Sequence, residues 1–141
     1  MSRRDDFHYP VRRALEKEGW FITHDPVILY FRDIRLKADL GGVRYIAASK
    51  EGWKIAVEVK NFAGTSYAND LEKMMGQLQL YEWALDEQEP DRELFLAISQ
   101  QVYDERVQNK ASALREVITR LKIKLIIFDN DQEEILQWIR H

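Results

Sequence analysis

The succession of helical and extended patterns constrains the fold of this chain more strongly than any other sequence feature. Residues 5–18 and 66–87 carry apolar side chains at helical spacing. The apolar stripe of the second helix comprises Leu71, Met74, Met75, Leu78, Tyr81 and Leu85. Between the helices, β-branched and aromatic runs predict strands at 20–31, 35–42, 44–49 and 53–62. Short glycine-containing turns join the last three, so we expect these strands to pair as a meander.

The second half of the chain adds one helical region and two further strands. Residues 93–99 and 124–129 are short apolar runs typical of buried strands. Residues 100–121 have a helical pattern interrupted near Gln108, whereas 133–139 suits either a strand or a short helix. The order α-β-β-β-β-α-β-α-β predicts an α/β fold with a central mixed sheet flanked by helices. With 141 residues and no linker or repeat, we expect a single domain over 1–141.

Composition excludes several classes of function. The chain has no cysteine, which excludes disulfides, thiolate metal sites and cysteine nucleophiles. Its net charge of −3 means that DNA binding would require a local basic patch. No apolar run approaches the roughly 18 residues of a membrane helix, and the N-terminus lacks a signal-peptide pattern. A cytoplasmic protein without membrane contact is therefore expected.

Charged residues occur within two of the apolar strands. Strand side chains alternate between faces, so Glu58 and Lys60 share a face with Ala56, opposite Val57 and its apolar neighbours. Asp39 likewise occupies the less apolar face of its own strand. The 18 residues between Asp39 and Glu58 are enough for one intervening strand and two turns, so the predicted meander could bring the two carboxylates together.

Two neighbouring carboxylates and a lysine suit phosphodiester cleavage. Mg²⁺ prefers hard oxygen ligands, and a bound cation activates water and neutralises phosphoryl charge. A lysine adds a point charge that orients the attacking water. The pattern is short, and by itself it is more often explained by charges on a solvated strand. Its apolar setting and the small neighbours Ala38 and Ala56 favour the site.

Gln77 and Tyr81 are four residues apart in the predicted second helix and therefore share one of its faces. Such side chains contact phosphates or base edges without carrying charge. Alternatively, Tyr81 lies at the edge of the core and Gln77 in solvent.

These motifs resemble those of the PD-(D/E)XK nuclease superfamily, whose RecB-like branch carries a similar Gln-x-x-x-Tyr helix. The whole chain resembles the XisH family, the fdxN element excision controlling factor of cyanobacteria. The resembling segments are 7–26, 38–41, 55–62, 70–81, 89–98 and 128–139.

The resemblance implies a restriction-endonuclease-like αβββαβ core. It also implies a factor that controls excision of a DNA element during heterocyst development. Its partners would be DNA, a site-specific recombinase and a XisI-like companion protein. Both a Mg²⁺-dependent endonuclease and a non-catalytic accessory protein fit this role, because fold alone does not decide function.

The resemblance also assigns roles to individual residues. Asp39 and Glu58 would bind Mg²⁺ or Mn²⁺, with the Val59 carbonyl as a further ligand. Lys60 would assist the attacking water, and Gln77 and Tyr81 would shape the site. Glu16, in the first helix, is either an additional acid of the site or a solvated helix residue.

The remaining candidates have ordinary structural explanations. His24 precedes Asp25 and could pair with a carboxylate, although a structural or solvated role is the commoner one. The four tryptophans are spread along the chain, which favours core or interface positions over a base-stacking platform. Edge strands and spare aromatic side chains make a homodimer a further expectation.

Overall fold

The computed structural model describes residues 5–36, 45–62 and 66–141. The N-terminal half contains α1 (Asp5–Lys17), β1 (Phe21–His24), β2 (Leu29–Phe31), β3 (Ile34–Leu36), β4 (Tyr45–Lys50) and β5 (Trp53–Val59). The C-terminal half contains α2 (Tyr67–Gln88), β6 (Arg92–Ser99), α3 (Gln100–Val102), the π-helical turn η1 (Tyr103–Val107), α4 (Ala113–Leu121), β7 (Leu125–Asp129) and β8 (Glu134–Ile139). The ambiguous segment 133–139 is therefore a strand.

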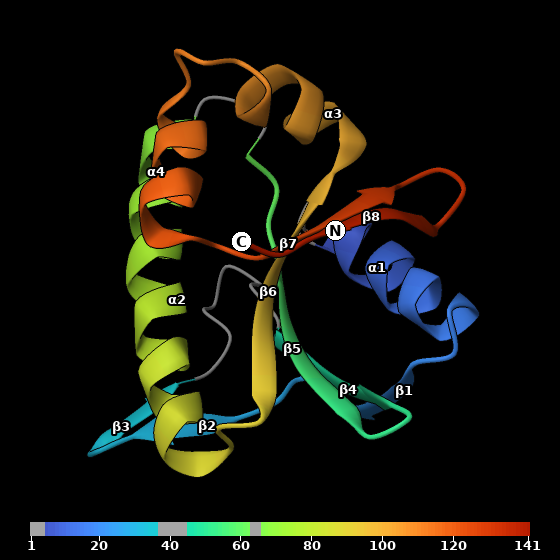
Figure 1. Ribbon diagram of the computed structural model, residues 1–141, viewed down its shortest axis with the longest axis vertical. Coiled ribbons are helices and arrows are strands. Elements are labelled where there is room, and N and C mark those ends of the chain that lie inside the picture. The colour runs from blue at the N-terminus through green and yellow to red at the C-terminus, as the bar shows by residue number, and fades with distance from the viewer. Residues whose placement is uncertain (1–4, 37–44, 63–65) are drawn as a thin grey trace.

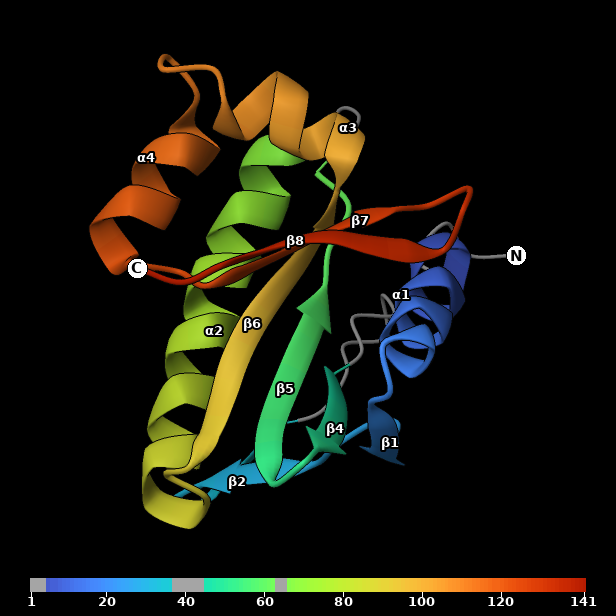
Figure 2. The ribbon, with the colours of Figure 1, turned by 45° about the vertical axis from the view of Figure 1, so that its right-hand side comes forward.

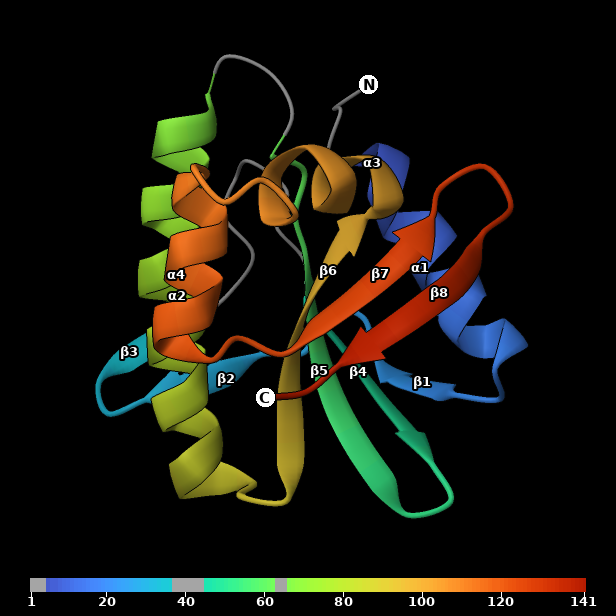
Figure 3. The same ribbon diagram turned by 45° about the horizontal axis from the view of Figure 1, so that its top comes forward.

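In the described part of the chain, six strands form one mixed sheet in the order β1-β4-β5-β6-β7-β8. The pairs β5–β6 and β6–β7 are parallel, whereas β1–β4, β4–β5 and β7–β8 are antiparallel. A parallel pair needs a long crossover, which α2 supplies between β5 and β6. Figure 3 shows β6, β7 and β8 side by side. The predicted mixed sheet is confirmed.

Helices cover both faces of this sheet. Figure 1 shows α1 on one side and α2 with α4 on the other, and Figure 2 gives the same arrangement from a second direction. Two apolar clusters follow this division. One joins α1 through Val11 and Leu15 to the sheet, and the other joins α2 and α4 to the opposite face. Because both faces are covered, the central strand β5 is buried on both sides from Ile55 onward.

The predicted meander is confirmed only for its last two strands, because β4 pairs antiparallel with β5. The segment Ile34–Leu36 pairs with Leu29–Phe31 in a separate two-stranded sheet rather than with β4. The second neighbour of β4 is β1, which comes from an earlier part of the chain. Since any strand can supply the same backbone hydrogen bonds, closeness in sequence did not identify the partner.

The hairpin of β2 and β3 packs against the C-terminal half of α2 (Figure 1). Phe31 contacts Trp83 with ring centroids 5.7 Å apart, and Arg32 forms an ion pair of 2.9 Å with Glu87. On α2, the predicted apolar stripe is confirmed except at Met75, whose side chain is exposed.

Candidate functional site

Glu58 lies in the middle of the central sheet and is completely buried. Along β5 it is paired in register with Tyr45 of β4 and Leu96 of β6. Ala56 belongs to the apolar cluster on the α2 side, whereas Val57 belongs to the cluster on the α1 side. Side chains alternate along a strand, so Glu58 shares the face of Ala56, as the sequence predicted, and this face is the one that α2 covers. A carboxylate in such surroundings requires hydrogen-bond donors or a counter-charge.

Lys60 continues the same face beyond the end of β5. Its backbone N–H donates to the Ala97 carbonyl over 3.2 Å, which extends the parallel ladder by one step. The side chain is only 7% exposed, and its ammonium forms no ion pair with any residue that the structure describes. Glu58 and Lys60 are therefore two charged groups on one apolar face, about 7 Å apart along the strand.

Tyr81 of α2 faces this carboxylate. Its side chain is 2% exposed, and burial, followed by the negative charge of Glu58, raises the pKa of its phenol well above the ordinary value. Tyr81 packs in the same apolar cluster as Ala56, which places it on the side of the sheet that Glu58 faces. Tyr81 is therefore a core residue and at the same time part of the Glu58 site.

Gln77 lies one helical turn before Tyr81. It is half-buried, and its amide oxygen Oε1 is buried without a hydrogen-bond partner among the described residues. A buried amide oxygen without a donor is uncommon in folded proteins. Gln77 and Tyr81 of α2 thus share one face of the helix, on the side of the sheet that Glu58 faces.

Asp39 and the Val59 carbonyl are the two other predicted ligands of the cation. Asp39 lies outside the described residues, and its predicted position beside Glu58 stays a prediction. The Val59 side chain packs on the α1 face. Because a trans peptide directs its N–H and C=O to opposite sides, the Val59 carbonyl points away from β6 and toward the β4 side. Glu58 pairs with Tyr45, the first residue of β4, so the Val59 carbonyl lies one position beyond the described pairing of the two strands.

The structure does not bring Glu16 to Glu58. Glu16 is exposed near the C-terminal end of α1 and forms an ion pair of 3.7 Å with Arg12. The helix packs through Val11 and Leu15 on the face of the sheet opposite Glu58. Glu16 follows Leu15 by one residue, which rotates its side chain toward solvent.

Comparison with known proteins identifies the family. A sequence model described as XisH protein matches residues 1–136. The chain belongs to the XisH family. A crystal structure of a fdxN element excision controlling factor protein from Anabaena variabilis is 38% identical, with a TM-score of 0.85 over 96% of this chain and 99% of that chain. An XisH family protein from Nostoc punctiforme PCC 73102 is 39% identical, with a TM-score of 0.80 over 96% of this chain and all of that one. No curated protein matches the chain.

A second polar cluster in this XisH protein is formed by His8, Arg12 and Asp25, whereas His24 is exposed, in line with the favoured solvated role. His8 of α1 is buried, and its Nε2 donates to Asp25 Oδ2 over 2.9 Å. Arg12 donates to the same oxygen over 2.7 Å. His24, the histidine next to Asp25 in sequence, instead contacts Thr23 with its Nδ1 at 3.0 Å. His8 and Arg12 are four residues apart and therefore share one helix face, and this spacing was the sequence signal that could have predicted the cluster.

The oxygen donors fit a hard cation, although the described residues supply only part of a site. Glu58 offers a buried carboxylate and Val59 a carbonyl, the ligand types that Mg²⁺ prefers. Within residues 5–36, 45–62 and 66–141, no three His, Asp or Glu side chains are grouped to hold a metal. The same residues include no helix long and apolar enough to cross a membrane.

Tyr81 is expected to make stability depend on pH in alkaline solution. In the unfolded chain its phenol ionises near pH 10, whereas its raised folded pKa keeps it protonated to higher pH. The unfolded state therefore releases its proton first, and stability falls above pH 10 by about 1.4 kcal/mol per pH unit. Urea unfolding from about pH 8 to pH 11 should show this loss in the wild type and a smaller one in Tyr81→Phe. Equal slopes would contradict the expectation.

Proposed function

We propose that this XisH protein controls the excision of a DNA element and hydrolyses DNA phosphodiesters with Mg²⁺ or Mn²⁺ at Glu58. The name of the Anabaena variabilis relative, at 38% identity over nearly the whole chain, supports the first part. The second part is supported by the completely buried carboxylate of Glu58, which is followed two residues later by buried Lys60 and whose charge acts on Tyr81 of α2.

The order of elements supports a restriction-endonuclease-like arrangement of the PD-(D/E)XK type. Leaving out the β2–β3 hairpin, the chain runs α1-β1-β4-β5-α2-β6, which is the αβββαβ order expected for such a core. Glu58 and Lys60 then stand on the last strand of the β-β-β unit, at the Glu-x-Lys positions of the motif.

The proposed chemistry divides the roles among a few side chains. Asp39, Glu58 and the Val59 carbonyl would hold the cation, which supplies Lewis acidity and lowers the pKa of a bound water. Lys60 holds and orients the attacking water and offsets charge on the phosphate. Tyr81 keeps its proton and donates it in a hydrogen bond, and the Gln77 amide positions the phosphate or a base edge.

The biological setting follows from the same proposal. The protein acts on DNA in the cytoplasm during heterocyst development, together with a site-specific recombinase and a XisI-like companion. The net charge of −3 restricts DNA contact to a local surface, which fits action within such an assembly.

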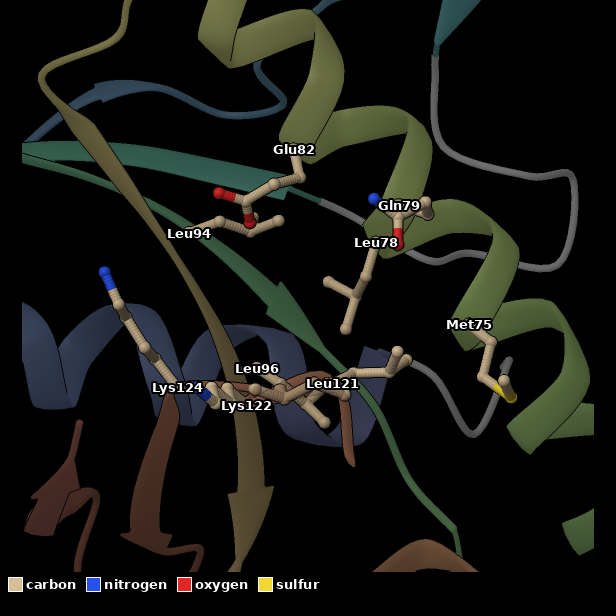
Figure 4. A pocket seen from close by; sticks show the side chains of 10 residues that line it. Met75, Leu78, Gln79, Glu82, Leu94, Leu96, Leu121, Lys122 and Lys124 are labelled. Atoms are coloured by element: carbon tan, nitrogen blue, oxygen red, sulfur yellow. The ribbon is translucent and has the colours of Figure 1, made fainter. Parts of the chain in front are cut away.

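A second candidate function is a non-catalytic accessory protein that binds its companion through a groove beside α2. This groove has a volume of about 190 Å³ and an apolar floor of Leu78, Leu94 and Leu96. Figure 4 shows Glu82 on α2 and Lys124 on the opposite wall. Exposed Met75 and Leu121 border it. This candidate requires neither Glu58 nor a metal.

Calorimetric titration with Mn²⁺ tests the proposed metal site directly. Wild type and Glu82→Gln, which removes an exposed carboxylate of α2, are expected to bind Mn²⁺ with the same heat. Glu58→Gln is expected to lose this heat, because an amide does not supply the anionic oxygen that a hard cation prefers. Identical heats for all three proteins would remove the metal site from the proposal.

A further inference from the structure

Three of the four tryptophans, although far apart in sequence, line one pocket. Trp20 follows α1, Trp53 begins β5 and Trp138 lies near the end of β8. Together they line a pocket of about 350 Å³ whose other walls include Glu18, Lys50 and Arg140. Its volume and mixture of aromatic and polar groups are typical of small-ligand sites.

The base of the pocket is rigidly built. Trp138 stacks on Trp20 at a centroid distance of 5.6 Å and meets Phe95 edge-on at 5.1 Å. Its indole N–H donates to Glu18 over 3.2 Å. Aromatic pairs and a satisfied indole N–H hold such rings in one orientation.

Trp53 is the exposed part of this cluster. Its side chain is 59% exposed, although the guanidinium carbon of Arg140 lies only 5.4 Å from its ring centroid. Arg140 is itself fixed by hydrogen bonds of 3.2 and 3.4 Å to Glu93. The Trp53 indole therefore contacts the Arg140 guanidinium on one side, and the rest of the ring is accessible to solvent.

The pocket lining combines the cations Lys50 and Arg140 with the carboxylates of Glu18 and Glu51. Arg140 is paired with Glu93, and Lys54 nearby is paired with Asp91 at 3.5 Å. Lys50 forms no ion pair within the described ranges. Its stem packs against Gly19, where an added Cβ would meet the Lys50 Cε at 3.4 Å. Gly19 has a φ of +92°, so a side chain there would also be strained.

We propose that this tryptophan pocket binds an unpaired nucleobase of single-stranded DNA, stacked on Trp53. Every base has a π-face that stacks on an exposed indole, and Lys50 supplies the cation for the adjoining phosphate. The Glu18 carboxylate accepts a hydrogen bond from an exocyclic amino group of the base. The inference rests on the proposed DNA function only for the choice of ligand class.

The pocket is separate from the Glu58 site. Trp53 and Glu58 are five positions apart at opposite ends of β5, about 17 Å along the strand, and the alternation places them on opposite faces. Binding of single-stranded DNA in the pocket is therefore expected to be independent of DNA cleavage at Glu58, and the two activities are measured separately.

Binding of a single-stranded cytidine oligonucleotide of about six nucleotides, without divalent metal, tests the proposal. Trp83→Ala is the matched control, because Trp83 is also exposed and packs on an aromatic ring elsewhere on the surface. Trp53→Ala is expected to weaken binding about 10-fold, whereas Trp83→Ala leaves it unchanged. Lys50→Ala is expected to lower the slope of log affinity against log salt by about 0.7. Thermal melting verifies that each variant is folded.

Two further measurements distinguish the possible failures. Glu58→Gln should bind the oligonucleotide as the wild type does, so an inactive cleavage site would leave this result unaffected. An abasic oligonucleotide of equal length should bind more weakly than the cytidine one. The proposal is overturned if the wild type does not bind, if the abasic strand binds equally well, or if Trp53→Ala binds like the wild type. If an aromatic peptide binds and its binding is weakened by Trp53→Ala, whereas oligonucleotide binding is not, the pocket binds a protein ligand. This result would also overturn the proposal.

Discussion

Glu58→Gln is expected to reduce metal-dependent DNA cleavage by at least about 100-fold while leaving the protein folded. Glu58 is the buried carboxylate of the central strand, and its negative charge is what the proposed cation site requires. Glutamine has nearly the same shape and is neutral, so the substitution removes a buried charge without opening a cavity. The rate is measured as nicking of supercoiled plasmid with Mg²⁺ or Mn²⁺, and the free energy of unfolding is measured in parallel.

The control for this prediction is Glu82→Gln. Glu82 is an exposed acid of α2, and its substitution is expected to change neither the cleavage rate nor the stability by a measurable amount. If the wild type cleaves and Glu58→Gln cleaves at the same rate, the proposed site is incorrect. If Glu58→Gln also leaves excision in the cell intact, the accessory function with its α2 groove becomes the better explanation.

Asp25→Ala is expected to lower the free energy of unfolding by about 3 kcal/mol. The Asp25 side chain is 10% exposed and accepts hydrogen bonds from both His8 and Arg12. His8 is almost completely buried, so removing the carboxylate leaves its ring without its recorded partner and also leaves Arg12 without its closest counter-charge. These contacts join α1 to the chain after β1, and their loss should be visible in urea unfolding.

Asp91→Ala serves as the comparison for Asp25→Ala. Asp91 is 66% exposed and forms an ion pair of 3.5 Å with Lys54. Exposed pairs of this kind contribute little, so a change within about 0.5 kcal/mol is expected. Equal losses in the two variants would show that burial of the His8–Asp25–Arg12 cluster adds nothing to stability.

The faces of β5 were predictable because they depend on local geometry alone. A side-chain period of two holds for any strand, so Glu58 and Lys60 had to share a face whatever lay beside them. The same reasoning applied to α2, where helical spacing placed Tyr81 and Gln77 together. Met75 was misassigned because its position borders the apolar stripe, where helical spacing alone does not separate the core from an exposed groove.

Strand pairing was not predictable in the same way. The segment Ile34–Leu36 turned back onto Leu29–Phe31, and β1 took the place beside β4. The tight turn between β2 and β3 contains Arg32 at a φ of +56°. Positive φ is uncommon for arginine, so the residue type gave no signal of this turn. The position of Asp39 beside Glu58 depended on that pairing and therefore stays a prediction.

The sequence by itself determined most of the helices and strands, the faces of β5 and of α2 apart from Met75, and the family to which the chain belongs. These properties follow from periods of two and 3.6 residues and from motifs along the chain. Only the tertiary structure decided which elements meet. It placed Tyr81 against Glu58, His8 against Asp25, and Trp20, Trp53 and Trp138 around one pocket. Such contacts form between distant positions because burying apolar surface favours many partners equally, and only the packing of the whole chain selects one arrangement.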